Sequence, residues 1–158
     1  MNLQTPVDPV NLRSPNEFFN QDINEILRGE VSATEAYDQV YENFQSSEDA
    51  DKLVSMKEEH DKAIQYWTTE AIDEGKIPEL ESSIWGTMVE IFVGASKIIG
   101  DNTALSALKK GEEHGLDNYE KMLTFSSLTK LQKRQIQNVF IPRQKKHIEI
   151  LDSMIGMR

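Results

Sequence analysis

The stretch Leu27-Arg28-Gly29-Glu30, with Tyr37 seven residues after the glutamate, decides the fold because its Gly-Glu…Tyr pattern occurs twice in the chain. The second copy reads Lys109-Lys110-Gly111-Glu112, and Tyr119 again follows seven residues after the glutamate. A context repeated at this distance indicates two related halves. We therefore expect each half to place its glutamate and its tyrosine in equivalent positions.

Each copy is followed by a histidine at an apolar position of the next expected helix. These histidines are His60 and His147, so each half supplies one inward glutamate, Glu30 or Glu112, and one inward histidine. A buried carboxylate is costly unless another group pairs with it. Four such groups, one on each helix, indicate a metal site or the remnant of one.

Apolar residues repeat at three- and four-residue spacings in four long segments, and this predicts four helices. The expected ranges are 15–44, 51–74, 103–124 and 129–155. Ser32-Ala33-Thr34-Glu35 could open a new helix, but we prefer one helix because the apolar stripe keeps its phase. Asp101, Asn102 or Thr103 can cap the third helix. Pro142 should kink or locally break the last one.

The order of the helices predicts the topology. Short turns join the first helix to the second and the third to the fourth, so each pair forms an antiparallel hairpin. The connection between the pairs is long and contains an apolar helix at 82–99. One long crossover between two hairpins is the ferritin-like arrangement. We predict an all-α, ferritin-like four-helix bundle over 15–158, with the extra apolar helix in the crossover and a flexible arm at 1–14.

The composition excludes several classes of function. The net charge of −10 argues against nucleic acid or an anionic membrane as a partner, because both are polyanions. The chain has no cysteine, which excludes disulfides, cysteine-ligated zinc, iron–sulfur clusters and thiol chemistry. We find no signal peptide and no membrane span, and expect a cytoplasmic protein. No phosphate loop or nucleophile motif supports a hydrolase or transferase.

Carboxylate plus imidazole suits iron, manganese or zinc, so these are the expected metals. Tyr37 and Tyr119 could hydrogen-bond to the carboxylates. Glu59 precedes His60 and could reach into the site. Gln144 shares the inward face of the last helix. His114 lies about 200° round the helix from Glu112 and is expected to face outward.

The site departs from the di-iron carboxylate pattern, which has a glutamate three residues before each histidine. Lys57 and Gln144 stand at those two positions. The two glutamates and two histidines that remain could bind one metal ion, or two metal ions weakly. They could also hold none, with each glutamate paired to a histidine.

The Gly-Glu…Tyr repeat, the inserted apolar helix and the closing Gln144-x-x-His147-Ile148-x-x-Leu151 resemble the ferritin-like superfamily. The nearest resemblance is to a bacterial branch known only as a domain of unknown function, and it covers residues 20–155. It implies kinship with rubrerythrin-type and ferritin-type di-metal proteins. By this resemblance Glu30 and Glu112 match the single-glutamate helices, and His60 and His147 match the histidine positions.

Two functions follow from these patterns. The first is a metal-binding ferritin-like protein in metal handling or oxidative-stress response. The second is a non-catalytic bundle with a degenerate site, acting as a dimeric or partner-binding structural or stress protein. In the second reading the apolar helix at 84–99 would be the interface, although we expect it to bury against its own bundle. We expect a homodimer, and the sequence does not decide whether the protein is an enzyme.

Overall fold

The computed structural model describes residues 15–81, 100–125 and 127–157 of the 158-residue chain, with side chains described from Ile23 onward. All regular elements in these ranges are helices, which confirms the all-α prediction for this part of the chain. They are α1 (Pro15–Phe44), α2 (Ala50–Asp73), α4 (Asp101–Met122), α5 (Lys130–Gln135), a π-helical turn η1 (Ile136–Phe140) and α6 (Ile141–Gly156). None of the described helices is long and apolar enough to cross a membrane.

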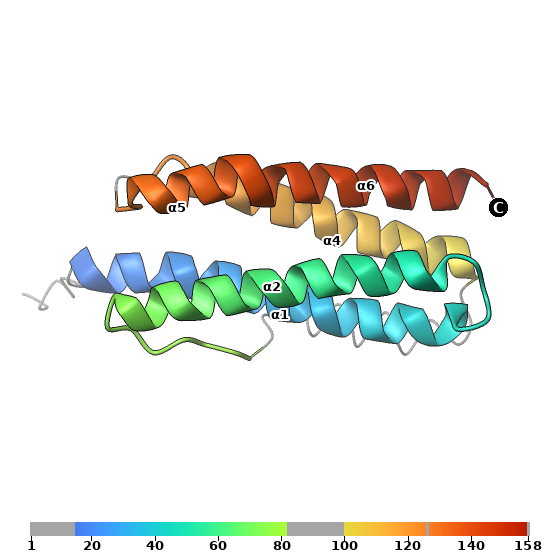
Figure 1. Ribbon diagram of the computed structural model, residues 1–158, viewed down its shortest axis with the longest axis horizontal. Coiled ribbons are helices and arrows are strands. Elements are labelled where there is room, and N and C mark those ends of the chain that lie inside the picture. Colours follow the sequence, from blue (N-terminus) through green and yellow to red (C-terminus); the bar gives the residue numbers. More distant parts are fainter. Residues whose placement is uncertain (1–14, 82–99, 126, 158) are drawn as a thin grey trace, which may run out of the picture.

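The long helices lie side by side along one axis (Figure 1). α1 and α2 run in opposite directions and pack along their length, and α4 packs in the same way against α6. α1 also contacts α4. α5, η1 and α6 follow one another as a single rod (Figure 1). The expected arm at 1–14 and the expected apolar helix at 82–99 lie outside the described residues, and the dimer expected in the sequence analysis stays a prediction.

α1 continues without a break through Ser32 and Thr34, as expected from the phase of its apolar stripe. Their hydroxyls donate to carbonyl oxygens within the helix, Ser32 to Arg28 at 2.9 Å and Thr34 to Val31 at 2.8 Å. Because these side chains bond to the preceding turn, they do not cap a new helix. The glutamate at position 30 therefore sits in an uninterrupted helix.

Gly75 ends α2, as predicted. Its φ of 71° lies in the left-handed region that favours glycine. The Gly75 amide donates to the Ile72 carbonyl at 2.9 Å, and the Lys76 amide donates to the Ala71 carbonyl at 2.8 Å. This pair of bonds satisfies carbonyls that the end of a helix otherwise leaves unpaired.

The start of α4 differs from the prediction. The helix begins at Asp101, two residues earlier than expected, and Gly100 occupies the capping position with no side-chain hydrogen bond. The predicted cap by Asp101, Asn102 or Thr103 is therefore wrong. The Gly100 carbonyl accepts from the Thr103 amide at 2.9 Å, so the backbone alone starts the first turn. Glycine is itself an acceptable capping residue, although it offers no side-chain acceptor.

The last helical rod shows how the chain accommodates Pro142. Proline has no amide hydrogen, and its ring clashes with the carbonyl four residues earlier in a regular helix. The π-helical turn Ile136–Phe140 ends two residues before Pro142, which falls in the first turn of α6. The predicted local break is therefore realised as one wider turn rather than an interruption.

Two apolar clusters fill the core, one toward each end of the helices. The first cluster contains Ile23, Ile26, Leu27, Ala63, Trp67, Ala71, Tyr119, Met122, Ile136 and Phe140. The second contains Tyr37, Val40, Phe44, Leu53, Met56, Ala104, Leu105, Leu108, Leu151 and Met154. On each helix a buried polar residue separates the two clusters: Glu30, His60, Glu112 or His147. A polar layer thus crosses the middle of the core.

Candidate metal centre

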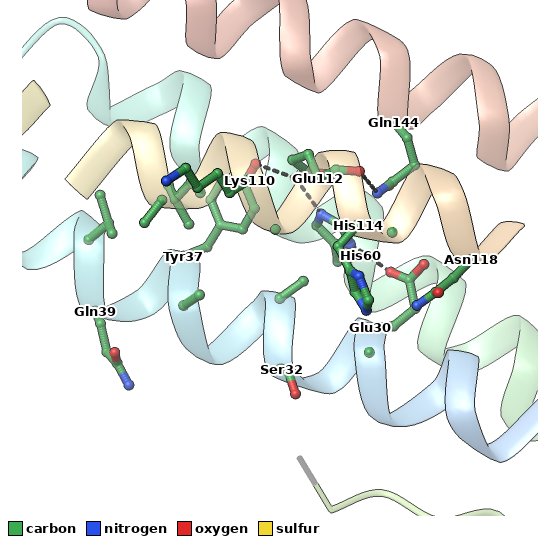
Figure 2. A pocket seen from close by; sticks show the side chains of 18 of the residues that line it. Glu30, Ser32, Tyr37, Gln39, His60, Lys110, Glu112, His114, Asn118 and Gln144 are labelled. Carbon is green, nitrogen blue, oxygen red and sulfur yellow. Dashed lines mark hydrogen bonds and ion pairs between the residues drawn. The ribbon is translucent and has the colours of Figure 1, made fainter. Parts of the chain in front are cut away.

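The four residues singled out by the sequence repeat meet in this polar layer. Glu30 comes from α1, His60 from α2, Glu112 from α4 and His147 from α6, and none is more than 4% exposed. Figure 2 shows Glu30, His60 and Glu112 lying toward one another beside Tyr37. They converge because each stands near the middle of its helix, where antiparallel helices share a level.

Glu112 stands at the centre of the group. Its Oε1 lies 2.9 Å from His60 Nε2 and 3.1 Å from His147 Nδ1. The same oxygen accepts a hydrogen bond from the Tyr37 hydroxyl at 2.5 Å. Its other oxygen, Oε2, is buried and has no hydrogen-bond partner in the described part of the chain. One oxygen is therefore crowded with three contacts while the other has none.

The outer nitrogen of each histidine faces a second carboxylate. His60 Nδ1 lies 2.6 Å from Glu30 Oε2, and His147 Nε2 lies 2.8 Å from Glu59 Oε2. Glu59 was expected to reach into the site, and it does so by contacting the histidine of the other hairpin. Its side chain is 34% exposed, so it connects the buried group to the surface.

Arg143 belongs to this layer and was missed by the sequence analysis. Its guanidinium is buried, and its Nη2 lies 2.6 Å from Glu30 Oε1. The group also lies over two aromatic rings, 5.8 Å from the Tyr119 centroid and 5.2 Å from the Phe140 centroid. Arg143 precedes His147 by four residues, a spacing that puts both on one helix face. That spacing was the available signal, but a search for apolar stripes discards an arginine.

The two positions where bridging carboxylates were expected behave differently. Lys57 forms an ion pair with Asp38 at 2.9 Å, on the partly exposed side of the helix. Gln144 turns inward, and its Nε2 donates to the Glu112 backbone carbonyl at 3.2 Å (Figure 2). Gly115 leaves the space for this amide, because a Cβ there would overlap Gln144 Nε2. Neither position supplies a carboxylate to the core.

The tyrosines of the repeat bond to the carboxylates in a crossed pattern. Tyr37, from the first half, donates to Glu112 of the second half. Tyr119, from the second half, donates to Glu30 of the first half at 2.5 Å, and its hydroxyl accepts from Trp67 Nε1 at 3.0 Å. The bonds were expected, but the exchange between halves was not. Burial and the adjacent carboxylates raise the pKa of both tyrosines, so both stay protonated as phenols.

The charges of the layer support one another. Burial by itself raises the pKa of Glu30, but the charges of Arg143 and His60 outweigh it and lower that pKa to about 2. Burial likewise lowers the pKa of His60, yet the charges of Glu112 and Glu30 raise it to about 9. The pKa of Glu112 lies well below its ordinary value, because the two histidines outweigh its burial. Without a metal ion, the carboxylates are ionised and His60 is an imidazolium.

Three of these residues fit a metal ion. One donor atom from each of His60, Glu112 and His147 lies within 4.8 Å of the other two. Two metal–ligand bonds of about 2.0–2.2 Å place their donor atoms at most about 4.4 Å apart, so a bound ion would draw the most widely spaced of these donors slightly closer together. The outer carboxylates on each imidazole would hold the rings and fix their tautomers, as they do at many metal sites. Glu30 is outside this set and contacts the far side of His60.

Two cavities adjoin the centre. One of about 270 Å³ lies between α1 and α4 and is lined by Tyr37, His60, Glu112 and small residues such as Gly111 (Figure 2). The other, of about 260 Å³, is lined by Glu59, His147 and neighbouring residues of α2 and α6. His114 is exposed, as predicted, and lies at the first cavity. The centre can thus be approached from two sides.

Comparison with known proteins gives one match. A family model described as "Domain of unknown function (DUF2383)" matches residues 20–124. This agrees with the expected resemblance to a domain of unknown function. No curated protein and no solved structure matches the chain. The matched range includes Glu30, His60 and Glu112 but ends before Arg143 and His147.

Proposed function

The chain belongs to the DUF2383 family, and we propose that it binds one divalent transition-metal ion through His60, Glu112 and His147. In this proposal Glu30 and Glu59 orient the two imidazoles from outside. The proposal changes the role of Glu30, which the sequence repeat had suggested as a ligand. Its oxygens are taken up by His60, Arg143 and Tyr119.

The observation that carries the proposal is the environment of the Glu112 carboxylate. Two imidazole nitrogens approach one of its oxygens, while the other is buried without a partner. A buried carboxylate oxygen with no partner is destabilising, and native proteins rarely contain one. A metal ion between the two nitrogens and this carboxylate would take up the lone pairs of all three groups.

We also infer a ferritin-like architecture. The antiparallel pairs α1–α2 and α4–α6 support it, as does the long connection between Asp73 and Asp101. Metal centres in such bundles are built in the core from side chains on facing helices. The polar layer here has the same location, midway between the two apolar clusters.

The ligand set narrows the choice of metal to iron, manganese or zinc. Two histidines and one carboxylate with open positions are typical of non-haem Fe(II) sites and of catalytic zinc sites. Such a set also accepts manganese. The cavity between α1 and α4 supplies room for a small molecule beside the centre. We propose a role in metal handling or oxidative-stress response.

A second candidate function has its own support. Both ring nitrogens of His60 contact carboxylates, and the charged form donates to both. The layer could therefore be a metal-free network of ion pairs in a non-catalytic bundle. Buried ion pairs of this kind are retained in some proteins for structural specificity. In that reading Glu112 Oε2 remains the unexplained group.

Metal titration distinguishes the two candidates. Protein stripped with a chelator and desalted is titrated with Co(II), whose visible absorption reports on its ligands, and then with Zn(II), Mn(II) and anaerobic Fe(II). We expect one equivalent to bind and to raise the unfolding temperature, because an ion that binds only the native state stabilises it. Binding of less than a tenth of an equivalent of every ion would refute the metal proposal and favour the ion-pair network.

Matched variants locate the ion. Glu112→Gln and His147→Gln should abolish stoichiometric binding. Glu113→Gln and His114→Gln, which change exposed residues of the same types on α4, should leave it intact. Glu59→Gln should weaken affinity by about 10–100-fold, as loss of an outer carboxylate does at other sites. Equal binding by the Glu112 and Glu113 variants would place the ion elsewhere.

A further inference from the structure

The two halves of the chain differ at the position four residues before the histidine of the polar layer. Arg143 stands four residues before His147, and Met56 stands four residues before His60. Each of these residues contacts the tyrosine of its own hairpin. The Tyr37 hydroxyl is 3.6 Å from Met56 Sδ, and the Arg143 guanidinium lies over the Tyr119 ring. One half therefore contains a fixed cation where the other contains a neutral thioether.

The guanidinium of Arg143 is surrounded by oxygen acceptors. Nη2 lies 2.6 Å from Glu30 Oε1 and 2.7 Å from Gln144 Oε1, while Nη1 lies 3.1 Å from the Glu59 carbonyl oxygen. Carboxylate, amide and backbone carbonyl oxygens are the ligands that hard divalent cations prefer. The guanidinium thus stands among oxygens that could otherwise coordinate an ion.

The two glutamates of the layer have different charge partners. Glu30 is neutralised by Arg143 and accepts from Tyr119, so its carboxylate is fully engaged. Glu112 faces histidines and a tyrosine, and no arginine or lysine pairs with it among the described residues. A divalent ion beside Glu30 would lie next to the buried positive charge of Arg143, where low screening makes repulsion strong.

We propose that Arg143 acts as a built-in cation that limits the centre to one metal ion on the Glu112 side. Removing its charge should open a second, all-oxygen site for a hard cation at Glu30, Gln144 and the Glu59 carbonyl. This inference rests on the proposed function for the first ion only. The additional metal ion bound after Arg143 is removed can be measured whether or not the first ion binds.

The test is a Mn(II) titration of the full chain, with free Mn(II) measured by its electron paramagnetic resonance signal. Wild type is compared with Arg143→Met, which copies the residue at the equivalent position, and with Arg143→Lys, which keeps the charge. We expect one Mn(II) per chain in wild type and in Arg143→Lys, and two in Arg143→Met. Adding Glu30→Gln to Arg143→Met should remove the extra ion, and should weaken binding of the first ion without abolishing it, because Glu30 also orients His60.

Each outcome decides the proposal. A gain of one ion in Arg143→Met over wild type supports it, even if wild type binds none and the proposed function fails. Equal stoichiometry in the two proteins overturns it, even if wild type binds one ion and the proposed function stands. Two ions in wild type also overturn it. If circular dichroism shows that Arg143→Met is unfolded, Arg143→Gln replaces it and the same criteria apply.

Discussion

Replacing Glu30 by glutamine should strongly destabilise the metal-free protein, although glutamine has nearly the same size and shape as glutamate. The substitution removes the charge that Arg143 faces at 2.6 Å. The side chains of Glu30 and Arg143 are 5% and 6% exposed, so water cannot take the place of the lost partner. The variant therefore leaves a buried guanidinium without a counter-ion.

The size of the effect follows from this burial. Removing one partner of a buried ion pair costs about 3–5 kcal/mol, because the remaining charge is uncompensated. In a chain of this size that corresponds to a fall in Tm of about 6–20 °C, at about 2–4 °C per kcal/mol. Adding Arg143→Met should restore much of the loss, with a coupling energy of about 2–3 kcal/mol between the two positions.

Urea unfolding in the presence of a chelator measures this cycle, with wild type, both single variants and the double variant followed by circular dichroism. Arg28 and Glu79 supply the control, since they form an ion pair with side chains 30% and 52% exposed. The same substitutions there should cost less than about 1 kcal/mol. A loss below about 1 kcal/mol for Glu30→Gln, or additive effects in the double variant, would refute the argument from an uncompensated charge.

Further predictions concern pH and packing. In chelated protein, Glu30, with its pKa lowered from 4.5 to about 2, contributes stability that is fully present above pH 4.5 and lost as the pH falls through about 2. His60, with its pKa raised from 6.5 to about 9, contributes stability that is fully present below pH 6.5 and lost as the pH rises through about 9. The unfolding temperature should therefore be highest between pH 4.5 and 6.5, where both contributions are fully present. His60→Gln should remove the fall in unfolding temperature at alkaline pH, and an unchanged fall would contradict the assignment to His60. Gly115→Ala, which places a methyl group against the Gln144 amide and forces that side chain to shift, should leave the protein about 1–3 kcal/mol less stable than Gly111→Ala does in urea unfolding. Gly111→Ala meets nothing within 4 Å and should stabilise the helix by about 0.5–1 kcal/mol, so equal effects of the two changes would refute the packing argument.

The sequence predicted those features that depend on periodicity along one helix. The apolar stripes located the helices, and the same stripes placed Glu30 and Glu112 on inward faces. The tyrosine spacing also indicated bonds to carboxylates. Periodicity works here because each helix buries one continuous face, so a polar residue in phase with that face must be buried as well.

Features that depend on contacts between helices were not predictable in the same way. Glu59 was considered with its neighbour His60, but its partner is His147 on another helix. Arg143 has the position of a core residue and the chemistry of a surface residue, and only its partner Glu30 explains its burial. The orientation of Gln144 depends on the gap at Gly115, a match between two helices that a one-dimensional pattern does not contain.

The crossed bonds between tyrosines and glutamates have a consequence for folding. Tyr37 and Glu112 are 75 residues apart, and Tyr119 and Glu30 are 89 apart, so each bond joins one hairpin to the other. A hairpin made alone would hold a carboxylate that lacks its hydroxyl donor and a tyrosine that lacks its acceptor. Neither half can complete its polar interior before docking, and docking therefore becomes the step that makes the transition cooperative. A chain cut between the hairpins would regain its structure only when both fragments are mixed.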